Sequence, residues 1–230
     1  MKKLLDVGCG PGTITNIGFY NKAKEKYKIY GIDFLENNIK LIKQRFSLGI
    51  FLKGKAEKLP YENNYFDIVI SHHLLEHVKN PQTVIKEMAR VSKKGALLHI
   101  AVPHERFENI ISPQIPHYMA EGHHHEQIFT KEIVISLLEK QSFEIVSVKN
   151  DKWPIFIIIF FLTKLSHFTK KVNMQDQTGV FLVGKNNYLA NKSFYSVYSF
   201  LYSLLSLVNI LFFFLNNIIP FELQITARKK

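Results

Sequence analysis

Short apolar runs alternate with segments of helical periodicity from residue 3 to residue 150. Residues 81–91 are typical of the helical kind, because their apolar side chains recur at the spacing of one helix face. Such alternation predicts βαβ units and a mainly parallel sheet. The predicted strands are Leu4–Val7, Ile29–Ile32, Ile50–Leu52, Phe66–Ile70, Leu97–Val102, Phe143–Val148 and Val180–Val183, and the predicted helices are Thr13–Glu25, Glu36–Phe46, Pro81–Val91 and Lys131–Lys140.

We therefore expect an α/β fold with a mainly parallel seven-stranded sheet, helices on both of its faces, and a C-terminal hydrophobic helical appendage. The domain boundaries follow from where the alternation stops. Residues 1–186 are predicted to form the α/β domain, with residues 151–177 as a hydrophobic insertion before the last strand. Residues 187–230 are predicted to form a hydrophobic helical tail.

The chain is basic, with a formal net charge of +11 over 230 residues. Such an excess favours nucleic acid, an anionic membrane surface or a phosphorylated substrate as a partner. The sequence shows no dedicated basic arm, so we expect no nucleic-acid partner. Cys9 is the single cysteine, and the first residues do not resemble an export signal, which together predict a cytoplasmic protein.

A glycine-rich turn follows the first predicted strand and leads into the first predicted helix. Its glycines are Gly8, Gly10 and Gly12, and Thr13 stands where the dinucleotide fingerprint G-x-G-x-x-G has its third glycine. A turn of this kind lets a nucleoside approach the backbone at the carboxyl edge of a parallel sheet. Asp33 ends the second predicted strand, where its carboxylate either accepts the hydroxyl protons of a ribose or caps the next helix.

Four blocks of the sequence together resemble the small-molecule class I methyltransferases of the ubiquinone and menaquinone biosynthesis type, which use S-adenosylmethionine. The blocks are Leu5–Gly12, Tyr30–Asp33, Ala56–Tyr61 running into Phe66–Ser71, and Glu87–Val91 before Lys94–Leu98. The resemblance covers roughly residues 4–148 and implies a Rossmann-like fold and a methyltransferase activity.

The resemblance also implies a cofactor site. Asp6 and the glycines are expected around the methionine part of S-adenosylmethionine and Asp33 at its ribose, with the 56–57 segment at the adenine edge. Ser71 and His72 are expected to line the pocket for methyl transfer. The implied cofactor-binding residues are Asp6, Gly8, Cys9, Gly10, Gly12, Asp33, Phe34, Ala56, Glu57, Ser71 and His72.

The chain departs from the family's pattern in two places. Lys55 stands where the family usually has an acid. A lysine donates hydrogen bonds but accepts none, so it cannot bind the adenine amino group as an acid would. The family normally has a helical segment before the first strand, which here begins almost at Met1. We expect either that another element covers the cofactor or that the start was assigned too late.

Histidines are the candidates for a proton-accepting residue, because their unperturbed pKa suits a base near neutral pH. His72 and His104 are the predicted catalytic bases, although some acceptors need none. His73 and His77 are spaced to share a helix face beside Glu76, which allows a metal site. The alternative, that His77 holds loop and helix together by hydrogen bonds, is favoured, so no metal is predicted. The histidine run at residues 123–125 lies in the segment after the fifth strand, which in this fold commonly shapes the acceptor pocket. Adjacent histidines of this kind are often only solvated, and such a run can bind metal nonspecifically.

Residues 193–221 carry no charged side chain and are long enough to cross a bilayer as a helix. They could span the membrane, lie in its surface or pack on the soluble domain. The apolar run at residues 153–162 is too short to cross alone and fits either a headgroup contact or a wall of the acceptor pocket.

The combined prediction is methyl transfer from S-adenosylmethionine to a small, hydrophobic or lipid-linked acceptor at the cytosolic face of a membrane. One alternative is a soluble methyltransferase whose aromatic tail closes its pocket or a dimer. Another is a membrane-tethered protein that keeps the fold without activity, for which Lys55 and the lack of a covering segment before the first strand are the motivating features. The oligomeric state and the methylated atom are not predicted.

Overall fold

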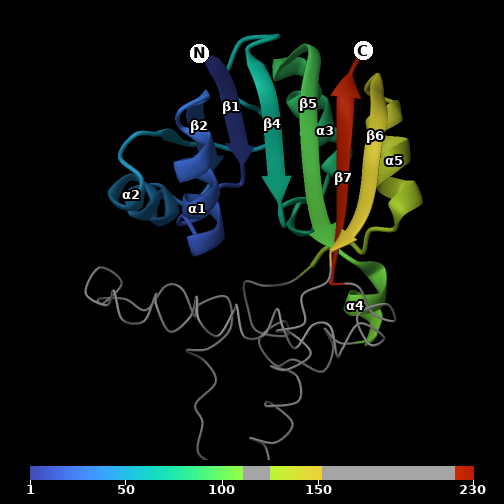
Figure 1. Ribbon diagram of the computed structural model, residues 1–230. Helices are drawn as coiled ribbons and strands as arrows, with labels where there is room; N and C mark the ends of the chain where they lie inside the picture. The colour runs from blue at the N-terminus through green and yellow to red at the C-terminus, as the bar shows by residue number, and fades with distance from the viewer. Residues whose placement is uncertain (111–124, 152–220) are drawn as a thin grey trace, which may run out of the picture. The chain divides into compact units, whose positions relative to one another are not determined.

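The computed structural model describes residues 1–110, 125–151 and 221–230, and its core is one seven-stranded sheet (Figure 1). The strands are β1 (Lys2–Val7), β2 (Tyr27–Asp33), β3 (Ile50–Lys53), β4 (Phe66–His72), β5 (Ser92–Pro103), β6 (Phe143–Asp151) and β7 (Glu222–Lys229). The helices are α1 (Ile14–Ala23), α2 (Glu36–Arg45), α3 (Pro81–Val91), α4 (Glu105–Ile110) and α5 (Lys131–Glu139), with a 3₁₀ turn, η1, at Leu75–His77.

The strand order is β3-β2-β1-β4-β5-β7-β6, and β1 pairs in parallel with both β2 and β4. The chain therefore reverses its direction of winding at β1. In open parallel sheets such a reversal leaves a crevice at the carboxyl ends of the two neighbouring strands, where ligands bind. The glycine turn leaves β1 at this point.

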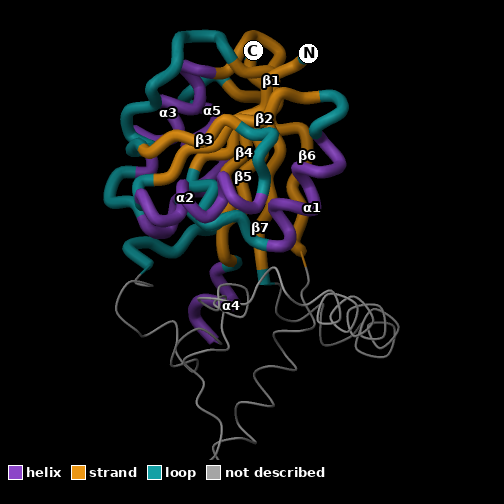
Figure 2. Tube along the Cα trace, turned by 90° about the vertical axis from the view of Figure 1, so that its left-hand side faces the viewer, coloured by secondary structure: helices purple, strands orange, loops and turns teal. Residues whose placement is uncertain are grey.

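Helices cover both faces of the sheet because the central strands are apolar on both sides. Leu4 and Ile29 pack with α1 and α2 on one face, whereas Leu5 and Val69 pack with α3 and α5 on the other. Figure 2 shows α3 and α5 on one side of the sheet and α1 on the other. This confirms the α/β class, the mainly parallel seven-stranded sheet and the helices on both faces.

The last strand of the sheet comes from a different part of the chain than expected. The apolar pattern favoured Val180–Val183, which lies outside the described residues, whereas β7 is formed by residues 222–229, assigned above to the helical tail. Its side chains alternate, with Leu223, Ile225 and Ala227 buried in the core. This period of two belongs to a strand with one buried face, and it was masked by the long apolar run directly before it.

β7 lies between β5 and β6 and runs antiparallel to β6, because the backbone N–H of Lys230 donates to the carbonyl of Ser142 at 3.0 Å. Figure 1 shows β7 running opposite to β5 as well. β6 therefore ends, and β7 begins, at the edge of the sheet at which β1, β4 and β5 end (Figure 1).

By its contacts the chain divides into two compact units. The first comprises Met1–Glu105, His125–Lys149 and Leu223–Lys230, and the second comprises Arg106–His124 and Asn150–Glu222. Within the described part of the second unit, the rings of Phe107 and Phe221 meet edge to face at 4.6 Å. The boundary predicted at residues 186–187 and residues 187–220 of the predicted helical tail lie outside the described residues and stay predictions. In the described ranges, we find no helix with the length and apolarity to cross a membrane.

Candidate functional site at the carboxyl edge of the sheet

The three glycines of the turn after β1 all have positive φ angles, +78° at Gly8, +58° at Gly10 and +73° at Gly12. Residues other than glycine rarely adopt this backbone conformation, which explains why glycine stands at each of the three positions. A Cβ at Gly12 would lie 3.0 Å from Cγ1 of Ile42, so Gly12 is also needed for packing. A Cβ at Gly10 would meet no atom within 4 Å, so the backbone of Gly10 faces open space.

The turn is fixed from both sides. The backbone N–H groups of Gly8 and Cys9 donate to the carbonyl of Ile32 on β2, at 2.8 and 3.0 Å. Nη1 of Arg45, in the last turn of α2, donates to the carbonyls of Pro11 and Gly12 at 2.8 and 3.0 Å. The turn is therefore held in one conformation before any ligand binds, which lowers the entropic cost of binding.

Asp33 ends β2 and contacts the turn directly. Its Oδ2 accepts from the backbone N–H of Gly10 at 2.9 Å, and its Oδ1 accepts from the N–H of Leu35 at 2.9 Å and from Nδ2 of Asn38 at 3.0 Å. Asp33 is not the N-cap residue of α2, which is Leu35 and has no side-chain cap, but its Oδ1 holds Leu35 and Asn38 at the start of that helix. A carboxylate oxygen has two lone pairs, so within the described residues Oδ2 keeps one acceptor position, and ribose binding stays a prediction.

Asp6 is buried behind the glycine turn and accepts a hydrogen bond from the hydroxyl of Tyr20 on α1. Burial raises the pKa of Asp6 from 3.8 to about 7, the Tyr20 hydrogen bond opposes the rise, and the nearby Asp33 charge adds to it. Burial also raises the pKa of the Cys9 thiol, which lies in the core against Gly31. The Cys9 side chain thus stays a neutral thiol, and only its backbone atoms can serve the predicted cofactor site.

The raised pKa of Asp6 gives a pH-dependent stability. An acid whose folded pKa is raised binds its proton more tightly when folded, so the wild-type chain loses stability as the pH rises from about 4 to about 7. We expect Asp6→Asn to remove this slope, with a gain over wild type that reaches the order of 4 kcal/mol above pH 7. Thermal unfolding of both proteins without ligand, at pH 5 and pH 8, measures it. Equal differences at the two pH values would contradict the assignment.

The segment implied at the adenine edge follows β3, with Ala56 half-buried and both Lys55 and Glu57 exposed. An ion pair on α3 holds the end of this segment. Nε of Arg90 donates to Oε1 of Glu87 at 2.7 Å, and Oε2 of Glu87 accepts from the backbone N–H of Leu59 at 2.8 Å. The hydrogen bond from Arg90, together with that from Leu59, holds the pKa of Glu87 below its usual value despite partial burial.

Ser71 and His72 are the last two residues of β4, as expected for residues lining a site at the carboxyl edge. Ser71 is fully buried, and its Oγ has no hydrogen-bond partner among the described residues. The ring of His72 lies 5.3 Å from that of His99 on β5, whose Nδ1 is 2.9 Å from Oγ1 of Thr226 on β7. His104 follows Pro103, the last residue of β5, so both predicted bases lie at the ends of neighbouring strands. Their roles stay predictions.

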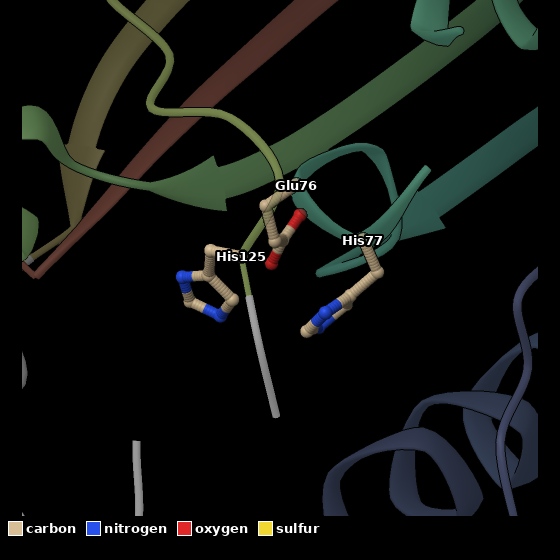
Figure 3. A group of neighbouring side chains, drawn as sticks. All are labelled: Glu76, His77 and His125. Atoms are coloured by element: carbon tan, nitrogen blue, oxygen red, sulfur yellow. The ribbon is translucent and has the colours of Figure 1, made fainter. Parts of the chain in front are cut away.

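The turn after β4 carries His73 and His77, for which the sequence allows either a metal site or a structural role. His73 has a positive φ of +50°, and its Nδ1 lies 3.1 Å from Oε1 of Glu76, so it does not share a face with His77. The ring of His77 instead lies 4.8 Å from the ring of His125, centre to centre (Figure 3). His125 belongs to the run that was expected to be solvated, and sequence spacing gave no signal that it meets the turn after β4.

With this geometry established, comparisons with known proteins assign the domain. Residues 5–100 match the model of the methyltransferase domain family. This stretch of the chain is a methyltransferase domain. It contains the second half of β1, β2 to β4, most of β5 and the glycine turn, and so includes the winding reversal described above.

Two curated relatives align with the methyltransferase domain. One is an uncharacterized methyltransferase of Schizosaccharomyces pombe, 36% identical over 104 residues, which make up 40% of this chain and 37% of the relative. The other is the demethylmenaquinone methyltransferase of Geobacillus stearothermophilus, 38% identical over 101 residues, 42% of this chain and 43% of the relative. The alignment thus covers about two fifths of each relative's length.

Solved structures extend the similarity of fold beyond the methyltransferase domain. The phosphoethanolamine N-methyltransferase 2 of Haemonchus contortus, solved with S-adenosyl-L-methionine, superposes with a TM-score of 0.55. The two chains are 16% identical, and the superposition covers 99% of this chain and 48% of the other. At this identity the likeness concerns the fold alone.

Proposed function

We propose that the chain transfers a methyl group from S-adenosylmethionine to a small acceptor. The observation that carries the proposal is the preformed turn of Gly8, Gly10 and Gly12 at the winding reversal, with Asp33 bonded to Gly10. The match of residues 5–100 to the methyltransferase domain family supports it. The solved relative that contains S-adenosyl-L-methionine supports the choice of cofactor.

The residues around the glycine turn fit this cofactor. The open space over Gly10 admits the close approach of the methionine part, and the remaining lone pair on Oδ2 of Asp33 can accept a ribose hydroxyl. Phe34 is 63% exposed and offers an apolar surface next to Asp33. Ala56 and Glu57 are proposed for the adenine edge, where Lys55 is exposed and can turn its ammonium group into solvent.

The bound cofactor supplies an electrophilic methyl group, and the chain supplies alignment. Methyl transfer from a sulfonium is an in-line displacement, so holding the acceptor in line and excluding water provides much of the acceleration. Ser71 at the end of β4 is proposed to position the acceptor through its buried Oγ. His72 or His104 is proposed to take a proton from acceptors that lose one.

We propose a hydrophobic or lipid-linked acceptor, such as a quinone precursor, which meets the protein at the cytosolic face of a membrane. Support for the acceptor class comes from the demethylmenaquinone methyltransferases among the relatives. Support for the location comes from the uncharged stretch at residues 193–221, which is outside the described residues, and from the net charge of +11. Flotation with phosphatidylglycerol vesicles tests the location, and recovery in the soluble fraction favours the soluble alternative.

Calorimetric titration of the full chain with S-adenosylmethionine tests the cofactor. We expect saturable binding of one molecule per chain. The absence of binding would contradict the proposed enzyme activity and favour a non-catalytic protein. Mass spectrometry of membrane lipids from cells with and without the protein then tests the acceptor. A species heavier by one CH₂ group only when the protein is present identifies it.

A further inference from the structure

Glu76 is a buried carboxylate that its hydrogen bonds satisfy only in part. Its side chain is 1% exposed, and Oε1 pairs with Nδ1 of His73 at 3.1 Å. Oε2 has no hydrogen-bond partner among the described residues. Leaving a buried carboxylate oxygen without a partner is costly, so an unpaired one in a native structure is explained by strain, a catalytic role, or a bound water or ion.

The unpaired carboxylate points toward two imidazole rings. Glu76, His77 and His125 each offer one ligand atom, and these three atoms lie within 4.8 Å of one another. Figure 3 shows the side chains converging from two separate segments, the turn after β4 and the segment that leads to α5. Glu76 is buried, His125 half-buried and His77 exposed, so an ion can reach the cluster from solvent.

The two segments are fastened together independently of these side chains. The backbone N–H of Glu126 donates to the carbonyl of Glu76 at 2.7 Å, and Nε2 of Gln127 donates to the carbonyl of Val78 at 2.9 Å. These bonds hold the residues next to His125 against η1. His73 supports the other side of the cluster, since its bond to Oε1 fixes the orientation of the Glu76 carboxylate, as outer groups do in metal sites.

We propose that Glu76, His77 and His125 bind a divalent transition-metal ion, with Zn²⁺ as the best fit. Two imidazoles and one carboxylate suit zinc, whereas Mg²⁺ and Ca²⁺ prefer oxygen ligands alone. Ligand atoms around a tetrahedral zinc ion lie about 3.3 Å apart, given bonds of about 2.0–2.1 Å. The cluster must therefore contract by at most about 1.5 Å, which rotation of the exposed His77 side chain can provide.

Three protein ligands leave one tetrahedral position open for water or a small ligand. The ion would also tie the segment before α5 to the turn after β4, next to the glycine turn, because Leu74 of that turn packs against Gly8. The site stands on its own geometry and does not depend on the proposed methyl transfer.

Competition with a chromophoric zinc chelator tests the site. The full chain is stripped with EDTA, exchanged into metal-free buffer at pH 7.5 and titrated with Zn²⁺ alone. We expect one tightly bound equivalent, an increase in melting temperature with zinc, and a loss of affinity of at least about 100-fold in His125→Ala. Glu76→Gln should lose zinc affinity in the same way if it folds. Because Glu76 is buried and its substitution can unfold the chain, the variant His125→Ala tests the site without changing that position.

The matched control is the double variant His123→Ala, His124→Ala, which removes the neighbouring histidines and keeps the cluster. It should bind zinc as the wild type does. Binding that is lost in the double variant but kept in His125→Ala would show metal capture by the histidine run alone and overturn the proposal. Failure of the wild type to compete with the chelator would overturn it as well.

Discussion

Ile225→Asp should abolish the cooperative unfolding of the domain, although only five residues of the sequence follow it. Ile225 is 1% exposed in the middle of β7, between β5 and β6. Burying an unpaired carboxylate and losing the apolar contacts each cost several kcal/mol, against a total stability of about 5–15 kcal/mol. Circular dichroism during heating measures the result, with loss of the sigmoidal transition expected.

Arg228→Ser is the matched control for Ile225→Asp, because Arg228 also lies on β7 but its side chain is exposed. Its effect should stay within about 0.5 kcal/mol. A chain with Ile225→Asp that melts at the wild-type temperature would show that the sheet does not depend on residues 222–229.

Gly10→Val should abolish binding of S-adenosylmethionine while the protein stays folded. The φ of +58° costs a β-branched residue about 1–3 kcal/mol, but no atom lies within 4 Å of the new Cβ. The added side chain would occupy the space through which the cofactor reaches the backbone. We expect a fall in affinity of at least about 100-fold by calorimetric titration, together with a modest fall in melting temperature.

Gly18→Ala provides the comparison within the same segment of chain. Gly18 lies inside α1, and a Cβ there also meets nothing within 4 Å. Alanine in a helix reduces the freedom of the unfolded chain, so this variant should be about 0.4–1 kcal/mol more stable and should bind the cofactor as the wild type does. If Gly10→Val retained normal affinity, the glycine turn would not be the cofactor site.

The sequence predicted the elements whose signal is local. The glycine turn, Asp33 at the end of β2 and the apolar face of α3 each depend on residues close together in the chain, and the structure has all of them. Asp33 holds both the glycine turn and the start of α2, and this pair of contacts could not be predicted. Its hydrogen bond to Gly10 depends on how the turn folds back over the strand.

Two features had no local signal. Residues 222–229 alternate as a strand does, but eight residues after a long apolar run also fit the end of a hydrophobic helix, and only the gap between β5 and β6 decides between them. The meeting of His125 with Glu76 and His77 joins segments that are far apart in sequence. Contacts of this kind are set by the path of the chain between β5 and α5, which residue spacing does not encode.

The position of β7 also orders events during synthesis. β5 and β6 are translated before residues 152–220, and the strand that pairs with both is translated after them. Until the ribosome has passed that stretch, the sheet presents two unpaired edges while a long apolar segment is already exposed. Unpaired strand edges and exposed apolar surface both promote aggregation. The order of translation therefore leaves the nascent chain open to aggregation until β7 has been made.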